Sequence, residues 1–328
     1  MPKVVCTSLG ADKGPHLELF RAAGFDVEVI PRQRQFDFNP QIMGILKDAA
    51  VVVAGSEPWT KDVLVQLPQL RVIARFGVGF DAVDLQACNE CGIVVTTTPG
   101  VLHHAVAEHT IALLMGVGRL FPARDQQVRR GEWVRVNTPR IAGSTLGLVG
   151  LGWIGQAVAT RAVGLGMKVI AYDLVPREEF SKQWNIEQVG FDELLARSDY
   201  ISLHCFMSPE NHHLINAQSI QKMKKGTVII NTARGPIIDE PALIEALKSG
   251  HLRGAGLDVF ETEPLSLNSP LIGMDNVLLS GHVAGIDNEA IADTFRMIVR
   301  TTLELYRGGW PQEAIRNMQG VTNWSWQR

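Results

Sequence analysis

The sequence predicts an α/β protein built on two doubly wound parallel sheets. Short runs of β-branched residues alternate with segments of helical apolar spacing over most of the 328 residues. The runs are apolar throughout rather than at every second position, which is typical of strands covered on both faces. They fall into two series, and a β-α-β alternation builds parallel sheets. The length fits about two domains.

The elements follow one another in a regular order. The first series contains five predicted strands, at 3–7, 26–30, 51–55, 70–74 and 92–96. One long helix is predicted over 103–121, after a Pro-Gly pair that favours a domain boundary. Six further strands are predicted at 145–149, 167–172, 200–204, 227–231, 254–259 and 276–280. A last helix is predicted over 287–307, with a polar start and a Gly-Gly stop.

Composition and charge argue against several classes of protein. The formal net charge is −3, so nothing favours binding to nucleic acid or to an anionic membrane surface. We expect no membrane span and no signal peptide, because the apolar runs are too short. The four cysteines are too few and too scattered for a disulfide framework, and Cys88-x-x-Cys91 lacks the second pair of a zinc site. We therefore expect a cytoplasmic protein without a metal.

A glycine turn follows the first strand of the second series. Gly150-x-Gly152-x-x-Gly155 stands between the strand 145–149 and a helical pattern. The first glycine permits a tight turn, the second lets backbone approach a pyrophosphate, and the third lets the helix pack on the strand. The N–H groups of Trp153 and Ile154 would point at the phosphates. The context indicates a dinucleotide site rather than a plain turn.

An acidic residue ends the next strand. Asp173 lies 23 residues after Gly150, which fits the spacing of a dinucleotide-binding fingerprint. Its carboxylate can accept hydrogen bonds from the adenosine ribose and would repel a 2′-phosphate. The sequence therefore predicts NAD rather than NADP as the cofactor.

Three further polar residues each follow a predicted strand of the second series. They are Arg234, Glu263 and His282. Ligands of open parallel sheets bind outside the carboxyl ends of the strands, so all three fall where a cofactor would lie. Hydride transfer to or from a carbonyl carbon also needs a proton donor or acceptor, and imidazole gains and loses protons near neutral pH. A guanidinium fork suits the carboxylate and carbonyl oxygens of a 2-oxo acid.

Together these motifs resemble those of the D-isomer-specific 2-hydroxyacid dehydrogenase family. The similarity extends from residue 75 to residue 285, through RFGVGFDAVD, VLHHAVAEHTIALLM, GLGWIG, NTARGPIID, LDVFETEP and GHVAG. One departure is Phe206, where the family usually has proline. The resemblance implies two Rossmann-like domains with a cleft between them. It also implies an enzyme that interconverts a D-2-hydroxy acid and its 2-oxo acid.

The resemblance implies a role for each site residue. His282 is the general acid/base, Glu263 its partner and Arg234 the substrate anchor. Substrate is also expected at Arg75 and at the N–H groups of Val78 and Gly79. Cofactor contacts are expected from Gly150, Gly152, Trp153, Ile154, Gly155, Asp173, His204, Thr232, Ala233, Asp258, His282 and Ala284, with Asp258 bonding the nicotinamide carboxamide.

The resemblance also implies a discontinuous architecture. Residues 1–101 and 287–328 would form a flavodoxin-like substrate-binding domain, and 102–286 the NAD-binding domain. A homodimer is expected through the NAD-binding domain, with the helix 103–121 contributing. For the C-terminal Trp324 and Trp326, a strand and a clasp against the substrate domain both remain open.

The substrate stays open between alternatives. The segments around 51–64 and 70–85 look most like the phosphoglycerate dehydrogenase branch, where an arginine at the position of Arg75 binds phosphate. Ala54 and Gly55 lie where that branch often has a second arginine, so a glyoxylate or hydroxypyruvate reductase is the alternative. A non-catalytic NAD-binding scaffold of the same fold is the rival from another class. That rival predicts the loss of the arginine, glutamate or histidine, and all three are present.

Overall fold

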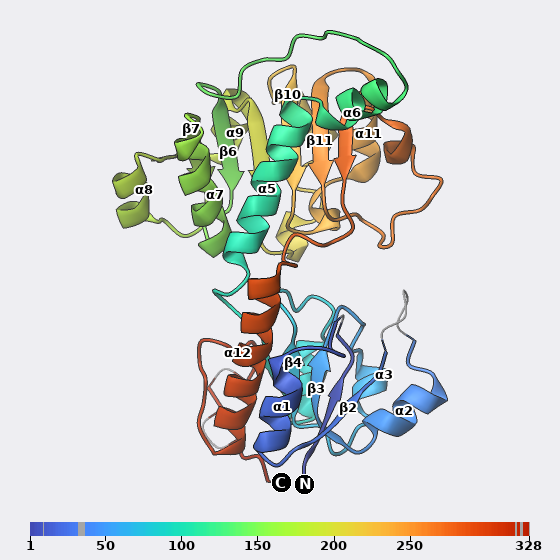
Figure 1. Cartoon of the computed structure of the whole chain (residues 1–328). Helices are drawn as coiled ribbons and strands as arrows, with labels where there is room; N and C mark the ends of the chain where they lie inside the picture. The colour runs from blue at the N-terminus through green and yellow to red at the C-terminus, as the bar shows by residue number, and fades with distance from the viewer. Residues whose placement is uncertain (9, 32–36, 319, 322–323, 328) are drawn as a thin grey trace. The chain divides into compact units, whose positions relative to one another are not determined.

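The chain divides into two compact units, each with its own parallel sheet. Unit 1 contains Met1–Leu102 and Asp287–Arg328, and unit 2 contains His103–Ile286. The computed structural model describes all residues except 9, 32–36, 319, 322–323 and 328 (Figure 1). No helix of the described part is long and apolar enough to cross a bilayer.

Unit 1 is a five-stranded parallel sheet in the order β2-β1-β3-β4-β5, with helices on both faces (Figure 1). Residues of β3 alternate between two cores, since Val51 and Val53 pack on one face while Val52 and Ala54 pack on the other. This two-sided burial explains the continuous apolar runs. The elements are β1 Lys3–Cys6, α1 Pro15–Ala22, β2 Asp26–Val29, α2 Pro40–Leu46, β3 Ala49–Ala54, α3 Lys61–Leu64, β4 Val72–Arg75, α4 Leu85–Glu90, β5 Val94–Thr96 and α12 Asn288–Tyr306.

Unit 2 is a seven-stranded parallel sheet in the order β12-β11-β10-β9-β6-β7-β8. Helices α5 and α7 cover one face, and α9, α10 and α11 cover the other. The elements are α5 His103–Gly118, α6 Phe121–Arg129, β6 Thr145–Val149, α7 Trp153–Gly164, β7 Lys168–Tyr172, α8 Glu178–Trp184, β8 Glu187–Gln188, α9 Phe191–Arg197, β9 Tyr200–Leu203, α10 Ala217–Gln221, β10 Thr227–Asn231, α11 Glu240–Lys248, β11 Leu252–Leu257 and β12 Val277–Leu279, with short 3₁₀ turns at Pro209–Asn211, Gly235–Ile237 and Pro270–Gly273.

The prediction of two parallel α/β sheets is confirmed, because every pairing between sheet strands in the described part of the chain is parallel. The prediction of one helix over 103–121 is wrong. α5 ends at Gly118, Leu120 has a left-handed φ of 54°, and a second helix starts at Phe121 with Pro122 in its first turn. The left-handed Leu120 interrupts the helical backbone, and Pro122 has no N–H with which to continue the hydrogen-bond ladder from α5.

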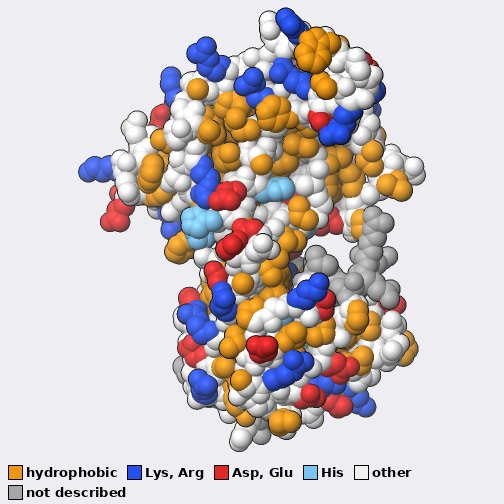
Figure 2. All heavy atoms as spheres, in the orientation of Figure 1, with side chains coloured by type: hydrophobic (Ala, Val, Ile, Leu, Met, Phe, Trp, Pro, Cys, Tyr) orange, Lys and Arg blue, Asp and Glu red, His pale blue; other side chains and the backbone are white. Residues whose placement is uncertain are grey.

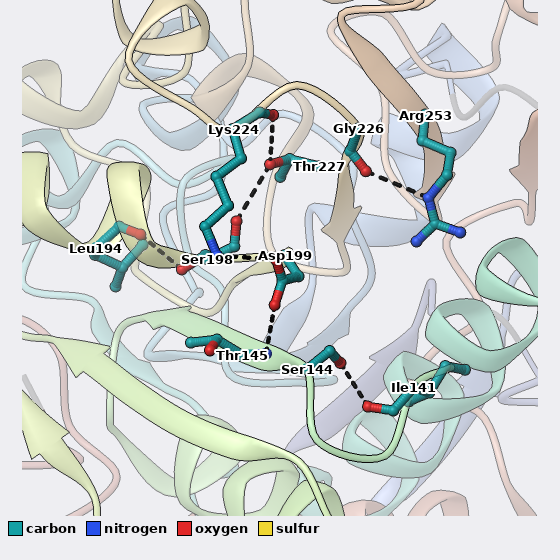
Figure 3. A network of polar contacts seen from close by, with 10 residues as sticks. All are labelled: Ile141, Ser144, Thr145, Leu194, Ser198, Asp199, Lys224, Gly226, Thr227 and Arg253. Carbon is teal, nitrogen blue, oxygen red and sulfur yellow. Dashed lines mark hydrogen bonds and ion pairs between the residues drawn. The ribbon is translucent and has the colours of Figure 1, made fainter. Parts of the chain in front are cut away.

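A network of polar contacts ties together the amino ends of the strands in unit 2 (Figure 3). The carboxylate of Asp199 accepts from the Thr145 N–H at 2.8 Å and from Lys224 Nζ at 2.9 Å. The Thr227 hydroxyl donates to the Ser198 carbonyl at 3.2 Å. These contacts hold the amino ends of the strands together. Ligands of open parallel sheets bind at the opposite edge, outside the carboxyl ends.

The C-terminal tail packs on unit 1 through its tryptophans. The Trp324 indole N–H donates to the Gly92 carbonyl at 3.0 Å. The guanidinium of Arg71 lies over the Trp324 ring, 5.1 Å from its centre. The Trp326 ring meets Phe25 edge-on. Of the two alternatives for the tail, the described residues form the clasp.

Candidate active site

The glycine turn of unit 2 connects β6 to α7. Gly150 has a φ of 101°, and a Cβ there would come within 2.7 Å of the His204 carbonyl group. A Cβ on Gly155 would lie 2.2 Å from the Gly150 oxygen. Packing of the protein itself therefore demands both glycines. Gly152 is different, because its φ is −71° and a Cβ would meet nothing within 4 Å. The absent side chain leaves open space beside the backbone, which fits the close approach of a pyrophosphate.

The first turn of α7 provides the donors for that anion. The N-cap is Gly152, so no side chain caps the helix. The first N–H groups of an α-helix have no partner within the helix, and the helix dipole favours negative charge there. Trp153 is 68% exposed, and Ile154 packs on the core below. The turn can therefore hold a dinucleotide.

Asp173 lies directly beside the glycine turn. Its Oδ2 accepts from the Leu151 N–H at 2.6 Å, and its Oδ1 accepts from the Val175 N–H at 2.8 Å. The following residues, 176–180, line a surface pocket of about 390 Å³. The fold thus brings the acid from the end of β7 to the loop after β6, as a dinucleotide fingerprint requires.

His204 follows β9 on the other side of the turn. Its Nε2 lies 2.8 Å from the Ser202 hydroxyl. Desolvation by the surrounding protein lowers the pKa of His204 to about 3. The ring is therefore neutral at physiological pH and adds no charge to the phosphate-binding region.

The loop after β10 brings Arg234 against the segment that precedes Glu263. A Cβ on Gly235 would lie 1.8 Å from the Phe260 carbonyl carbon, so only glycine permits this contact of two loops. Asn231 folds the loop, since its side-chain amide donates to the Arg234 carbonyl at 2.8 Å and its oxygen accepts from the Ala233 N–H at 3.0 Å. Arg234 and the Glu263 segment are therefore held together in one unit.

Glu263 and His282 form a hydrogen-bonded pair. His282 Nδ1 lies 2.7 Å from Glu263 Oε2, and Glu263 Oε1 accepts from the Phe260 N–H at 3.1 Å. The side chains are 44% and 36% exposed. With Nδ1 donating to the carboxylate, Nε2 is the ring nitrogen left to exchange a proton. An imidazole held in this way can exchange a proton through Nε2 while the carboxylate fixes its tautomer.

The loop that carries His282 is folded around Asp258. The Asp258 carboxylate is fully buried and accepts from the Val283 N–H at 3.0 Å, the Ala284 N–H at 2.9 Å and the Ser280 hydroxyl at 2.6 Å. The Asp258 carbonyl accepts from the His282 N–H at 2.7 Å. These bonds hold His282 at a left-handed φ of 56°, a conformation that costs about 1–2 kcal/mol for a side-chain-bearing residue.

Burial raises the pKa of Asp258, but hydrogen bonds from His109, Ser280 and the two N–H groups outweigh burial and lower it overall. The carboxylate is thus ionised at neutral pH. Its Oδ1 accepts from Ser280 and Val283, and its Oδ2 accepts from the Ala284 N–H.

Two other expected cofactor contacts lie at the end of β10. Thr232 is 9% exposed, and its hydroxyl lies 2.9 Å from the Thr110 hydroxyl of α5. Ala233 is half-buried in the loop before Arg234. Both therefore lie at the carboxyl edge of the sheet, near Arg234 in the chain.

The expected substrate residues of unit 1 lie at the end of β4 and in the loop after it. Arg75 is 7% exposed, with Nε donating to the Gly79 carbonyl at 3.0 Å and Nη1 to the Ala54 carbonyl at 2.9 Å. The guanidinium thereby braces the loop that contains Val78 and Gly79. Nothing in these bonds requires a bound phosphate.

Two polar residues that the sequence did not single out lie close to strand ends. In unit 2, Nε2 of His109 in α5 lies 2.8 Å from the Ser280 hydroxyl, just after β12. Glu57 follows β3 and is 2% exposed, with Oε1 accepting from the Gly55 N–H at 2.9 Å. The available signal for Glu57 was its position just beyond the carboxyl end of a strand.

Similarity to known proteins agrees with this geometry. Residues 111–284 match the family model "D-isomer specific 2-hydroxyacid dehydrogenase, NAD binding domain". The chain is 38% identical over 272 residues to a glyoxylate reductase of Korarchaeum cryptofilum, covering 81% of this chain and 82% of that protein. It is 36% identical to a D-3-phosphoglycerate dehydrogenase of Archaeoglobus fulgidus, over 89% of this chain and 55% of that protein.

A solved structure of D-lactate dehydrogenase from Aquifex aeolicus, in complex with NAD and lactic acid, superimposes with a TM-score of 0.84. It is 29% identical and covers 95% of this chain and 98% of that one. The fold and the nucleotide-binding unit define an NAD-binding oxidoreductase. The chain belongs to the D-isomer specific 2-hydroxyacid dehydrogenase family.

Proposed function

We propose that the protein transfers hydride between NAD and a small D-2-hydroxy acid or its 2-oxo acid, with His282 and Glu263 as the acid/base pair and Arg234 as the substrate anchor. The observation that carries this proposal is the 2.7 Å contact between His282 Nδ1 and Glu263 Oε2, next to a loop that presents Arg234. A non-catalytic scaffold has no need of an imidazole whose tautomer is fixed by a carboxylate.

Each side chain has a distinct task. The bound cofactor would supply a hydride as NADH for reduction and would accept one as NAD⁺ for oxidation. His282 Nε2 gives a proton to the carbonyl oxygen as the alcohol forms, and takes it back in the opposite direction. Glu263 fixes the ring tautomer and stabilises the imidazolium. Arg234 binds the carboxylate and carbonyl oxygens through its planar fork, and the N–H groups of Val78 and Gly79 bind the carboxylate.

The cofactor is held by residues along the carboxyl edge of unit 2. The turn of Gly150, Gly152 and Gly155, with the N–H groups of Trp153 and Ile154, binds the pyrophosphate. Asp173 binds the adenosine ribose. The remaining contacts are His204, Thr232, Ala233, Asp258, His282 and Ala284.

Turnover tests this proposal directly. The purified full chain should oxidise NADH when given a 2-oxo acid, from a panel of glyoxylate, hydroxypyruvate, pyruvate and 3-phosphohydroxypyruvate. Absorbance at the NADH band gives the rate, and hydroxypyruvate should yield D-glycerate. NADH that binds without any oxidation on the whole panel would favour the scaffold instead.

Removal of the Asp173 charge should relax the choice of cofactor. In Asp173→Asn, we expect the ratio of kcat/KM for NADPH to that for NADH to rise about tenfold or more, which is about 1.4 kcal/mol. The reason is that the carboxylate would no longer repel a 2′-phosphate. Steady-state kinetics with both cofactors measure the ratio. Asp192→Asn, an exposed acid of α9 paired with Lys222, is the control. Equal use of both cofactors by the unchanged protein would contradict the role of Asp173.

The apolar surface of unit 2 supports a homodimer through this unit. Figure 2 shows hydrophobic side chains gathered over the face that carries α5 and α6. Exposed apolar residues follow one another along α6 and the segment after it: Phe121, Val128, Trp133, Val134 and Val136. The side chain of Trp133 is the most exposed of these five, at 80%. Aromatic residues are enriched at protein interfaces, and a run of this size rarely faces water in a monomer.

A single charge should break this dimer. Trp133→Glu should sediment as a monomer at micromolar concentration, because a carboxylate would be buried at the interface without a partner. Analytical ultracentrifugation measures the mass. Leu267→Glu changes an equally exposed apolar residue, at 89%, in the same unit and should leave the mass unchanged. A monomeric mass for the unchanged protein would refute the assembly.

A further inference from the structure

Helix α5 packs closely on β11 and β12 of unit 2. A Cβ on Gly256 of β11 would lie 3.0 Å from Leu113 Cβ, and a Cβ on Gly116 of α5 would lie 2.7 Å from Leu278 Cδ2 of β12. Glycine at these two positions therefore lets the helix and the strands approach each other. His109 stands four residues before Leu113, so it projects from the same face of α5, one turn nearer to the start of the helix. This face brings the imidazole to the loop that follows β12.

A chain of hydrogen bonds connects His109 to the buried carboxylate of Asp258. His109 Nε2 lies 2.8 Å from Ser280 Oγ, and Ser280 Oγ lies 2.6 Å from Asp258 Oδ1. His109 Nε2 itself is 3.5 Å from the same carboxylate oxygen. Asp258 also accepts from the Ala284 N–H, two residues after His282. The imidazole of α5 is thus connected through two side chains to the loop that carries the proposed acid/base.

The direction of each hydrogen bond in this chain follows from the number of protons. The ionised carboxylate of Asp258 has no proton to donate, so the Ser280 hydroxyl donates its single proton to it. The Ser280 oxygen then accepts from His109, which therefore has its proton on Nε2 when the ring is neutral. His282 instead has its proton on Nδ1, where it donates to Glu263. The two imidazole rings are held in opposite tautomers.

We propose that His109 is a positioning residue for His282 and acts through Ser280 and Asp258. This inference rests on the proposed function, in which His282 Nε2 exchanges a proton with the substrate oxygen. His282 has a left-handed φ of 56°, and the bonds from its loop to Asp258 oppose relaxation of that backbone. His109 keeps the Ser280 hydroxyl turned toward Asp258, because the hydroxyl oxygen accepts from a ring that α5 holds in place. Without this ring, His282 would still contact Glu263 but would be aimed less accurately at the substrate.

A kinetic comparison of two substitutions at His109 tests this role. In His109→Leu, which removes the donor, kcat for a 2-oxo acid should fall about 10- to 100-fold, because a misplacement of about 1 Å at the reacting groups has an effect of this size. KM should stay within about twofold, since Arg234 is unchanged and still binds the substrate. His109→Gln should recover most of kcat, because glutamine can present an N–H near the position of Nε2.

The matched control is His104→Leu, the same substitution on the same helix. His104 is exposed and contacts Arg161, so its removal should leave kcat unchanged. Full retention of kcat by His109→Leu would overturn the positioning role while leaving a dehydrogenase established. Equal losses in His109→Leu and His109→Gln would overturn it too, because the donor would then have no part in the effect.

Two further measurements need no turnover. Nitrogen NMR of protein with isotope-labelled histidine, at mildly alkaline pH, should show the Nε2–H tautomer for His109, with its signals assigned by their absence from His109→Gln. Amide hydrogen exchange at Val283 and Ala284 should be faster in His109→Leu than in the unchanged protein, since both N–H groups bind Asp258.

These two results separate the inference from the function on which it rests. The Nδ1–H tautomer for His109, or equal amide exchange in the two proteins, would overturn the positioning role even if 2-oxo acids are reduced. If both results are as expected and no 2-oxo acid is reduced, the proposed function fails while the connection from α5 to the His282 loop stands.

Discussion

His282→Asn should lower kcat by about 10²–10⁴-fold, the usual contribution of a positioned acid/base. Asparagine keeps a donor near the Glu263 carboxylate but cannot exchange a proton with the substrate oxygen. Because His282 is one of many proposed cofactor contacts and the glycine turn and Asp173 are unchanged, NADH should still bind with little change in Kd. Stopped-flow or steady-state NADH oxidation measures kcat. Quenching of protein fluorescence measures the Kd of NADH.

The control for this experiment is a histidine at the opposite edge of the sheet. His251 Nε2 contacts the Ile220 carbonyl at 2.9 Å, before β11. His251→Asn should therefore retain most of the turnover. If His282→Asn kept more than about a tenth of the activity, well above the range expected for a lost acid/base, the assignment would be wrong.

Arg234→Lys should lower kcat/KM by about 10²-fold or more. A hydrogen bond to a charged group contributes about 1.5–3 kcal/mol, and lysine cannot reproduce the two parallel bonds of a guanidinium. Arg234 is proposed to bind the substrate carboxylate in both the ground state and the transition state, so the weaker contact in the variant should raise KM. The carbonyl contact strengthens as charge develops on oxygen, so kcat should fall as well.

Steady-state kinetics of Arg234→Lys give both kcat and KM when a 2-oxo acid is varied at saturating NADH. Arg197→Lys is the matched control, because Arg197 lies in an exposed pairing with Glu187 and Glu193. Retention of the original KM by Arg234→Lys would show that the arginine does not hold the substrate.

Local sequence patterns predicted most of the fold for a physical reason. Strands such as β3 and β10 are buried on both faces, so their sequences are uninterrupted apolar runs. The two-residue strand β8 was not predicted, because Glu187 and Gln188 lie at the exposed edge of the sheet and carry no apolar signal. The break at Leu120 also escaped, since helical apolar spacing continues through it.

The site was only partly predictable. Arg234, Glu263 and His282 were recognisable because each follows a strand and lies in a motif. The left-handed backbone of His282 and its support by Asp258 depend on contacts between β11 and the loop after β12, which no local pattern records. The same holds for Glu57 and Arg75, whose bonds to the peptide group between Ala54 and Gly55 become visible only when β3 and β4 lie side by side.

A crystal structure of the full chain with NADH and oxamate, an unreactive isostere of pyruvate, tests the central claim most directly. We expect the Arg234 guanidinium on the oxamate carboxylate and His282 Nε2 within hydrogen-bond distance of the carbonyl oxygen, with His282 Nδ1 still on Glu263. Oxamate bound out of reach of Arg234 and His282 while NADH occupies the glycine turn would contradict it.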